Sequence, residues 1–367
     1  MAADKEFDLV LLGPTGYTGK LTAEHIVRHF PTNLKWALII TDQLNSEVMD
    51  SLVRRTRVVI NCVGPYHLYS TPVVEACAKN GTHYVDVLII PSVGLESAPP
   101  DILAWAVVNL IRTKLSANPA EVVGSIYDIK AAGASGGTLN TMLTTIETVK
   151  LSDLAKLADP YALAASPSPP TRVIPRKSLA ELILGVRSVS DLGTLTTSPS
   201  GHNDETIVNR SSTLLPDFYG PSFSYRHFLH VRNAFIGVAF HYALTIGIAL
   251  LLLPPVRWIV RQFVYAPGQG PTKEESRNDM VEFRTVATVD QKGEGRPSRA
   301  IGSLSFQGSM YALTGVTVSE AARVILEHEN EVRQVSGGGI VTPATLGQNY
   351  LDRLEKAGFR IQTKLLD

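Results

Sequence analysis

The chain of 367 residues has no excess of charge of either sign and little cysteine. Lysine plus arginine and aspartate plus glutamate each number 34, so the formal net charge is zero. Because proteins that bind nucleic acid through its phosphates carry an excess of positive charge, we expect no nucleic-acid partner. The two cysteines, Cys62 and Cys77, lie in apolar stretches without the spacing of metal ligands. We predict that they are core residues in a reducing compartment, with no metal site.

The sequence also lacks the motifs of several enzyme classes. It contains no Ser-His-Asp order, no zinc spacing and no Walker sequence, so neither a hydrolase nor a kinase is indicated. Its first six residues, Met-Ala-Ala-Asp-Lys-Glu, are charged and unlike a secretory or transit peptide, which predicts a cytoplasmic location. The length predicts two domains, each large enough to bury a core.

A glycine-rich turn near the start is the strongest motif. Leu9–Leu12 predicts a buried strand, and Lys20–Phe30 predicts a helix. Between them the first glycine permits a tight turn, the second lets the backbone approach a pyrophosphate, and the third allows close helix packing. The alternative is a purely structural glycine turn. The turn residues predicted to bind a dinucleotide are Gly13, Thr15, Gly16, Tyr17, Thr18 and Gly19.

Strands and helices alternate after this turn. The predicted strands are Lys35–Ile40, Val58–Val63 and Gly81–Asp86, and the predicted helix is Pro72–Asn80. This alternation predicts an α/β fold with a Rossmann-like, doubly wound parallel sheet. Ligands of such sheets bind beyond the carboxyl ends of the strands, so Gly64 and Pro65 join the predicted cofactor site.

The later part of the chain predicts a second α+β domain. Met280–Val289 and Arg299–Phe306 alternate in hydrophobicity and predict a hairpin in a mixed or antiparallel sheet. Residues 166–170 and 194–204 are rich in Ser, Thr, Pro and Gly and predict exposed loops. Ala344–Gly358 predicts an amphipathic helix that returns to the first domain.

The predicted domain ranges follow from these elements. Residues 1–106 form the dinucleotide-binding domain, which residues 335–367 complete. Residues 107–334 form the second domain, for substrate or oligomerisation. The alternative is a single NmrA-like sensor domain with an unrelated tail.

Six stretches of the chain resemble the saccharopine dehydrogenase-like oxidoreductases, including the trans-acting enoyl reductase subfamily. They occur in the family's order, at residues 13–19, 58–66, 81–86, 94–101, 134–138 and 341–358. The resemblance implies NADP as the cofactor, with NAD as the other choice, and reduction of a polyketide or lipid-like substrate. It also implies association with membranes or lipid droplets. A polyketide synthase and a second copy in a homodimer are the implied protein partners.

The chain departs from this family after its second strand. Family members continue into a Gly-Arg-Ser type turn and a helix, and the arginine would select NADP by neutralising its 2′-phosphate. Here Trp36–Leu38 runs directly into Ile39–Asp42, which resembles the family's third strand. Asp42 lies 23 residues after Gly19, close to the spacing of a ribose-binding acid. Its context instead resembles an adenine-side position on a later strand.

A second departure follows Asp86. Family members continue into a Thr-Gly-Glu turn and a helix at the nicotinamide end of the cleft, whereas Val87–Pro91 follows at once here. Two losses at element boundaries are typical of a gene model with skipped exons or of a degenerate paralogue. The sequence leaves both open, and with them a non-catalytic protein that has lost part of its cofactor site.

Few residues could carry chemistry. Hydride transfer requires orientation of the nicotinamide and at most one proton donor. Tyr66 is the candidate donor, and its alternative is a packed turn residue. Asp86 is better explained by a turn or cap, and His83 by a strand position with satisfied hydrogen bonds. Asp101 is predicted to cap the helix Ile102–Arg112.

One uncharged segment, Ala234–Leu253, is unusually apolar. As a helix its 20 residues would measure about 30 Å, close to the hydrocarbon thickness of a bilayer. Val256–Val264 follows with apolar and cationic faces suited to a membrane interface. We expect docking on a membrane or lipid-droplet surface. The alternatives are a full span and a helix buried in the second domain.

Overall fold

The computed structural model describes residues 5–86, 94–95, 97–148, 159–164, 173–266, 268–291, 297–336 and 339–366. In the amino-terminal part the elements are β1 Phe7–Leu12, α1 Tyr17–His29, β2 Trp36–Ile39, α2 Ser46–Arg54, β3 Thr56–Asn61, α3 Tyr66–Asn80, β4 His83–Asp86 and α4 Ala98–Leu115. The middle part contains β5 Pro119–Lys130, α5 Gly136–Thr148, α7 Leu179–Leu184, β6 Val186–Val189, β7 Gly193–Thr197, α8 Gly201–Leu214, α9 Pro216–Tyr219, β8 Ser224–Val231, α10 Ala234–Leu251 and α11 Pro254–Arg261. The carboxyl-terminal part contains η1 Glu275–Asn278, β9 Met280–Val289, β10 Arg299–Gln307, α12 Met310–Glu327, α13 Glu329–Ser336, η2 Pro343–Leu346, α14 Gly347–Lys356 and β11 Arg360–Leu366.

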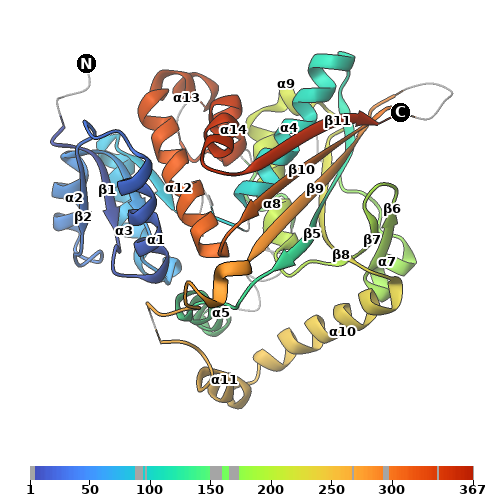
Figure 1. The fold of residues 1–367 in the computed structure, drawn as a ribbon, viewed down its shortest axis with the longest axis horizontal. Coiled ribbons are helices and arrows are strands. Elements are labelled where there is room, and N and C mark those ends of the chain that lie inside the picture. The colour runs from blue at the N-terminus through green and yellow to red at the C-terminus, as the bar shows by residue number, and fades with distance from the viewer. Residues whose placement is uncertain are drawn as a thin grey trace.

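Two sheets organise the molecule (Figure 1). The first has four parallel strands in the order β2-β1-β3-β4, and the second has seven in the order β11-β10-β9-β5-β8-β7-β6. In the second sheet only β5 and β8 pair in parallel; the other neighbours are antiparallel. The prediction of a parallel α/β sheet joined to a mixed second sheet is confirmed.

The first sheet is doubly wound because its strands are apolar on both faces. Leu9 and Leu11 of β1 pack towards α1 and α12, whereas Val10 and Leu12 pack towards α2 and α3. All four side chains are at most 1% exposed. A strand buried on both faces is expected to be continuously apolar, as this one is.

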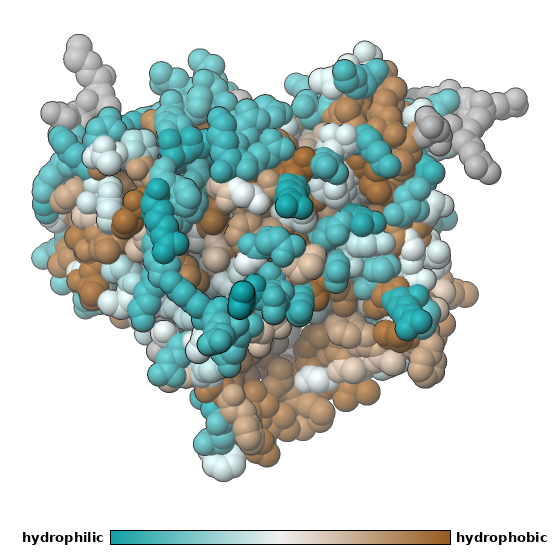
Figure 2. Space-filling view, viewed as in Figure 1, coloured by the Kyte–Doolittle hydropathy of each residue, from teal (hydrophilic) through white to brown (hydrophobic). Residues whose placement is uncertain are grey.

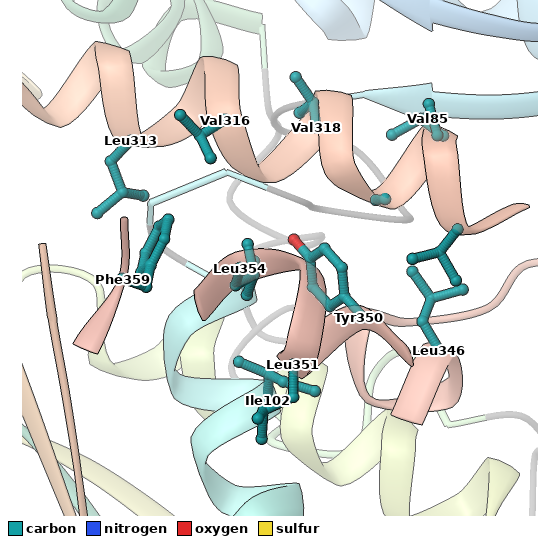
Figure 3. Packing of buried hydrophobic residues seen from close by; sticks show 14 of the residues in the cluster. Val85, Ile102, Leu313, Val316, Val318, Leu346, Tyr350, Leu351, Leu354 and Phe359 are labelled. Carbon is teal, nitrogen blue, oxygen red and sulfur yellow. The ribbon is translucent and has the colours of Figure 1, made fainter. Parts of the chain in front are cut away.

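Helix α12 joins the two sheets. It packs on α1, β3 and β4 of the first layer, and its core continues into Phe283 of β9 and Leu304 of β10. Figure 3 shows Tyr350 and Leu354 of α14 between α12 and Ile102 of α4. The Tyr350 hydroxyl, which is fully buried, donates to the Thr317 carbonyl of α12 at 3.0 Å. One continuous core therefore runs through both layers.

Several sequence predictions meet the structure at this level. Met280–Val289 and Arg299–Phe306 do form the predicted antiparallel hairpin. Residues 194–204 are not a loop: they include β7 and the first turn of α8. Thr196 is fully buried there, and its hydroxyl donates to Gly185 O and Gly237 O, which satisfies its polar group inside the sheet. Residues 166–170 and 87–91 lie outside the described residues.

The two predicted domain ranges do not follow the two sheets throughout. α12, inside the range given to the second domain, covers the first sheet, and β11, inside the range given to the first domain, is an edge of the second. The amphipathic helix α14 packs on α12. The sequence of α12 could not show which sheet this long helix covers. It is apolar on most of its faces, so the core beneath either sheet could bury it.

The apolar helix α10 does not lie in a core. Among its residues only Gly237 is buried, and Phe235 is 84% exposed. It is long and apolar enough to span a membrane by length and composition, with 6% of it buried. Figure 1 shows α10 along one border of the molecule, and Figure 2 shows that border as a largely apolar surface. The alternative of a buried core helix is therefore wrong.

Asp101 links α4 to the carboxyl-terminal segments. It lies in the first turn of α4, four residues after that helix's N-cap, Ser97, so the predicted capping role is wrong. Its buried carboxylate accepts hydrogen bonds from the Ser211 hydroxyl at 2.6 Å and from the Ala344 amide at 2.7 Å. Burial raises the pKa of Asp101 to about 7, although hydrogen bonds from Ser211, Ala344 and Thr342 oppose the rise.

We predict that Asp101 makes the protein less stable as the pH rises from about 4 to about 7. Over that range the folded state keeps a proton that the unfolded chain, whose carboxyl pKa is near 3.8, has released. The loss approaches a few kcal/mol, at about 1.4 kcal/mol for each pH unit crossed. Urea unfolding at several pH values should show this slope in the wild type and a smaller slope in Asp101→Asn. The exposed Asp217→Asn should keep the wild-type slope, and an unchanged slope in Asp101→Asn would contradict the prediction.

Candidate functional site

The three glycines of the turn after β1 each have a distinct steric role. Gly13 has φ of +74°, and a Cβ on it would lie 2.6 Å from Cγ2 of Val63. A Cβ on Gly19 would lie 2.0 Å from the Gly13 carbonyl oxygen, so α1 packs directly on the turn. A Cβ on Gly16 would meet nothing closer than 3.4 Å. Only Gly16 is therefore free of a packing requirement, as expected for the position that a pyrophosphate approaches.

The predicted cofactor residues lie on two neighbouring loops. Residues 13–19 follow β1, and Gly64 and Pro65 follow β3, which pairs with β1. α1 begins at Tyr17 without a side-chain cap, and α3 begins at Tyr66, also without one. Both helix amino-termini lie at the carboxyl edge of the sheet. Such ends carry partial positive charge and unpaired amide groups, which suit an anionic ligand.

A chain of buried polar groups braces the same sheet edge. The Gln43 amide donates to Asn61 at 3.0 Å, Asn61 donates to the Tyr84 hydroxyl at 3.1 Å, and that hydroxyl donates to Asp86 at 2.9 Å. The Val63 amide also donates to Asn61, at 3.1 Å. The chain connects the loop after β2 to the last residues of β3 and β4. It therefore fixes the three carboxyl ends relative to one another.

Tyr66, the predicted proton donor, is 7% exposed at the start of α3. Burial raises its pKa well above 10, and the nearby Cys62 and Asp86 raise it further. The phenol is therefore protonated at every physiological pH. Burial also raises the pKa of the Cys62 and Cys77 thiols to about 12, and both side chains are buried, which confirms that they are core residues.

The remaining polar candidates lie at opposite ends of β4. His83 is the first residue of β4, at its amino end, and its Nε2 lies 3.2 Å from a Glu329 oxygen. Burial lowers the pKa of His83, although Glu329 opposes this. Asp86 is fully buried and belongs to the polar chain above. Within the described ranges no group of three His, Cys, Asp or Glu residues could hold a metal ion.

A segment of the second half of the chain crosses the site. This crossing segment comprises residues 265–266 and 268–272. The Gly136 amide at the start of α5 donates to Gln269 O at 3.0 Å. A Cβ on Gly136 would lie 2.1 Å from Tyr265 O, and a Cβ on Gly270 would lie 3.0 Å from the Tyr17 ring. The crossing segment thus lies against both α5 and the glycine turn.

Two tyrosines close this arrangement. The Tyr17 hydroxyl donates to Pro271 O at 2.5 Å, and its ring meets the Tyr311 ring edge to face with centroids 4.9 Å apart. The Tyr311 hydroxyl accepts from the Ser135 amide at 2.5 Å and lies 3.0 Å from Oγ1 of Thr138. The sequence predicts Tyr17 for the cofactor site, and in the structure its hydroxyl donates to Pro271 O of the crossing segment.

Sequence reasoning missed the crossing segment, Tyr311 and Gln43. The pairs Gly136-Gly137 and Gly268–Gly270 could have indicated a close backbone approach, since glycine is favoured where chains meet. Tyr311 and Gln43 carry no comparable signal. Their positions depend on packing between segments far apart in the sequence.

Comparisons with known proteins identify the family. Residues 37–121 match the saccharopine dehydrogenase NADP binding domain. These residues resemble that domain, and the chain as a whole is homologous to proteins named trans-acting enoyl reductase. A Mycobacterium leprae trans-acting enoyl reductase is 25% identical over 435 aligned positions that cover 100% of both chains. A Mycobacterium tuberculosis protein, named provisionally as a trans-acting enoyl reductase, is 25% identical over 433 positions covering 100% of this chain and 99% of its own.

A solved structure supports the fold. Saccharomyces cerevisiae saccharopine dehydrogenase (L-Glu forming) superimposes with a TM-score of 0.51 at 11% identity, covering 98% of this chain and 100% of its own. The chain thus has a fold like that of saccharopine dehydrogenase, and its residues 37–121 resemble an NADP binding domain.

This chain has fewer residues than the relatives with which it aligns. The alignment with the tuberculosis relative spans 433 positions, whereas this chain supplies 367 residues, so at least 66 positions have no residue here. The structure shows a consequence at the first departure: β2 has four residues, Ile39 pairs with Leu12 of β1, and β2 is the edge of the described sheet. Asp42 therefore follows the strand beside β1 and not a separate later strand. The second departure lies at residues outside the described ranges.

We predict opposite outcomes for two neighbouring glycines of α5. Gly136→Ala should lower the thermal unfolding midpoint by several degrees, because its Cβ would collide with the backbone of the crossing segment. Gly137→Ala should leave the midpoint nearly unchanged, since its Cβ would lie 3.8 Å from the nearest atom, Oγ of Ser135. Differential scanning calorimetry measures both. Equal midpoints would show that the crossing segment is not held against α5.

Proposed function

We propose that the protein is an NAD(P)H-dependent oxidoreductase that reduces an enoyl or similar double bond in a polyketide or lipid-like substrate. The steric pattern of Gly13, Gly16 and Gly19 carries the proposal, because the glycine that pyrophosphate approaches has no packing role of its own. The reaction class is taken from relatives named trans-acting enoyl reductase. The resemblance also gives a polyketide synthase and a second copy of the chain as partners.

The residues around the glycine turn have separate tasks in this proposal. A bound nicotinamide dinucleotide supplies the hydride. The amides that open α1 hold its pyrophosphate, and the loop Gly64–Pro65 borders the nicotinamide. Tyr66 holds a proton on its phenol, because burial raises its pKa, and is the candidate to deliver that proton to the substrate. A raised pKa makes the phenol a weak acid, so delivery requires negative charge to develop on the substrate.

The competing function is a non-catalytic member of the family. Its support is the shortened sequence, in which at least 66 aligned positions lack a residue. The family's Gly-Arg-Ser turn is among the parts absent. Each charge-assisted hydrogen bond lost from a cofactor costs about 1.5–3 kcal/mol, and two such losses weaken binding by roughly a hundredfold or more. Binding measurements separate the two functions.

We predict that the wild type binds NADH or NADPH and that Gly16→Ala binds the same dinucleotide more weakly. The Cβ of Gly16→Ala fits the folded protein, with its nearest neighbour at 3.4 Å, but occupies the side from which pyrophosphate approaches. Calorimetric titration should show at least a tenfold loss of affinity, about 1.4 kcal/mol. The unfolding midpoint of the unliganded variant should stay near that of the wild type, which controls for folding. Absence of heat with the wild type at millimolar dinucleotide would exclude the enzyme proposal for this chain.

We further propose that α10 and α11 dock on a lipid surface. Exposed apolar side chains continue from α10 into α11, including Trp258, which is 67% exposed, and Phe263, which is 85% exposed. Arg257 and Arg261 lie on the same stretch and contact Glu147 of α5. Aromatic and cationic residues beside an apolar helix favour the headgroup boundary of a membrane. Docking would bring the cleft close to an apolar substrate.

Docking explains the topology better than a full span. β8 precedes α10 and β9 follows it, yet both strands pair with β5 in one sheet. A spanning α10 would place these two strands on opposite sides of a bilayer. The amino-terminal half of α10 is also held to β7 and α7. Thr197 of β7 lies 2.8 Å from His241, and Tyr242 donates to Ile183 O of α7 at 2.9 Å.

We predict that the intact protein floats with phosphatidylcholine–phosphatidylserine vesicles in a density gradient. A variant with Leu250–Leu253 changed to Ser should float several-fold less, because burial of each lost methylene contributes about 0.8 kcal/mol. The double variant Ile40→Ser, Leu44→Ser removes exposed apolar residues elsewhere and should float like the wild type. An intact protein that stays soluble, monodisperse and unbound to vesicles would contradict docking.

A further inference from the structure

The loop after β2 lies where a dinucleotide fold meets the adenosine ribose. Leu12 of β1 pairs with Ile39 of β2, so the glycine turn and residues 40–45 leave the sheet at neighbouring points. In folds of this kind an acid after the second strand accepts a hydrogen bond from the ribose 2′-hydroxyl and selects NAD. An arginine nearby instead accommodates the 2′-phosphate of NADP. The side chains on this loop therefore decide which cofactor fits.

The loop holds Asp42 in a fixed position. Its neighbour Gln43 is 4% exposed and is anchored to Asn61 at the end of β3. Because Gln43 points into the protein, Asp42 lies on the exposed side of the loop. Oδ1 of Asp42 accepts the Leu44 amide at 3.0 Å in a local turn, which orients the carboxylate and leaves Oδ2 without a contact among the described residues.

No cation accompanies this acid on its own loop. From β2 to the last turn of α2, the sequence contains no lysine or arginine between Lys35 and Arg54. Lys35 precedes β2, and Arg54 ends α2, so both lie at the amino edge of the sheet. On the helix that follows the glycine turn, Lys20 of α1 is a cation that could compete. It lines a shallow depression on that helix with Glu24 and Arg28, where acid and base are mixed.

We propose that Asp42 makes this site select NADH over NADPH. The inference rests on the proposed function and narrows its cofactor. The carboxylate accepts the ribose 2′-hydroxyl, whereas the 2′-phosphate of NADPH brings two negative charges beside it with no neutralising partner on the loop. The match to an NADP binding domain spans residues 37–121 and so includes this loop, but the loop carries an acid and no cation, which does not fit a 2′-phosphate.

The test uses ligands that lack the nicotinamide ring. Their binding therefore does not depend on the second departure, after Asp86, which the family resemblance places at the nicotinamide end of the site. ADP-ribose and 2′-phospho-ADP-ribose are titrated calorimetrically into the full-length protein. We expect ADP-ribose to bind at least about tenfold more tightly. Asp42→Asn should weaken ADP-ribose by about tenfold and reduce or abolish the preference, because it removes the charge-assisted hydrogen bond and the repulsion together.

Two further variants serve as controls. Glu47→Gln removes an exposed negative charge from the next helix and should leave the preference unchanged; an equal effect would assign selection to the general field and overturn the role of Asp42. Tighter binding of 2′-phospho-ADP-ribose, lost in Lys20→Gln, would overturn the inference while leaving the proposed function intact.

The inference and the proposed function can fail separately. If ADP-ribose binds with the expected preference but NADH binds no better and no reductase activity is found, the inference holds and the proposed function fails. Binding of neither ligand would overturn both.

Discussion

The arrangement of the two sheets depends on the packing of α12 between them. Glu320 of this helix is 2% exposed, and its carboxylate contacts His25 of α1 at 2.7 Å and Arg353 of α14 at 2.8 Å. Burial alone would raise the pKa of Glu320, but hydrogen bonds from His25 and Arg353 and the charge of Arg353 lower it. A buried carboxylate held by two partners strongly disfavours separation of those partners, because it would be left unpaired. The glycine turn and the second sheet are therefore held in one geometry.

The same packing decides what could be predicted from the sequence. Local signals were sufficient for β1, its glycine turn and the β9–β10 hairpin, where hydrophobic period and turn residues agree with the final structure. They failed for residues 194–204, where Thr and Ser side chains are satisfied inside a sheet by partners such as Gly237 O. Composition cannot separate such a strand from a loop.

The site shows the same division between local and long-range information. Gly13 and Gly19 each answer a local steric requirement, and Gly16 lies between them in the same short motif, so a local pattern is enough to single out all three. Tyr311 and Pro271, which engage Tyr17, lie more than 250 residues further along the chain. No short motif could indicate that contact. The polar chain from Gln43 to Asp86 was likewise hidden, because it joins the ends of three strands that become neighbours only in the folded sheet.

The position of the first departure explains how the fold tolerates it. In the sheet order β2-β1-β3-β4, β2 is an edge strand, so a shortened connection after it leaves both neighbours of β1 in place. The chain then crosses from β2 to β3 through α2, on the face opposite α1 and α12. Loss at an edge costs fewer buried contacts than loss at a central strand. The cost appears as exposed apolar side chains at that edge, where Leu38 and Ile40 are 44% and 74% exposed. The same edge has a second role in the proposed function, because the carboxyl end of β2 borders the proposed cofactor site.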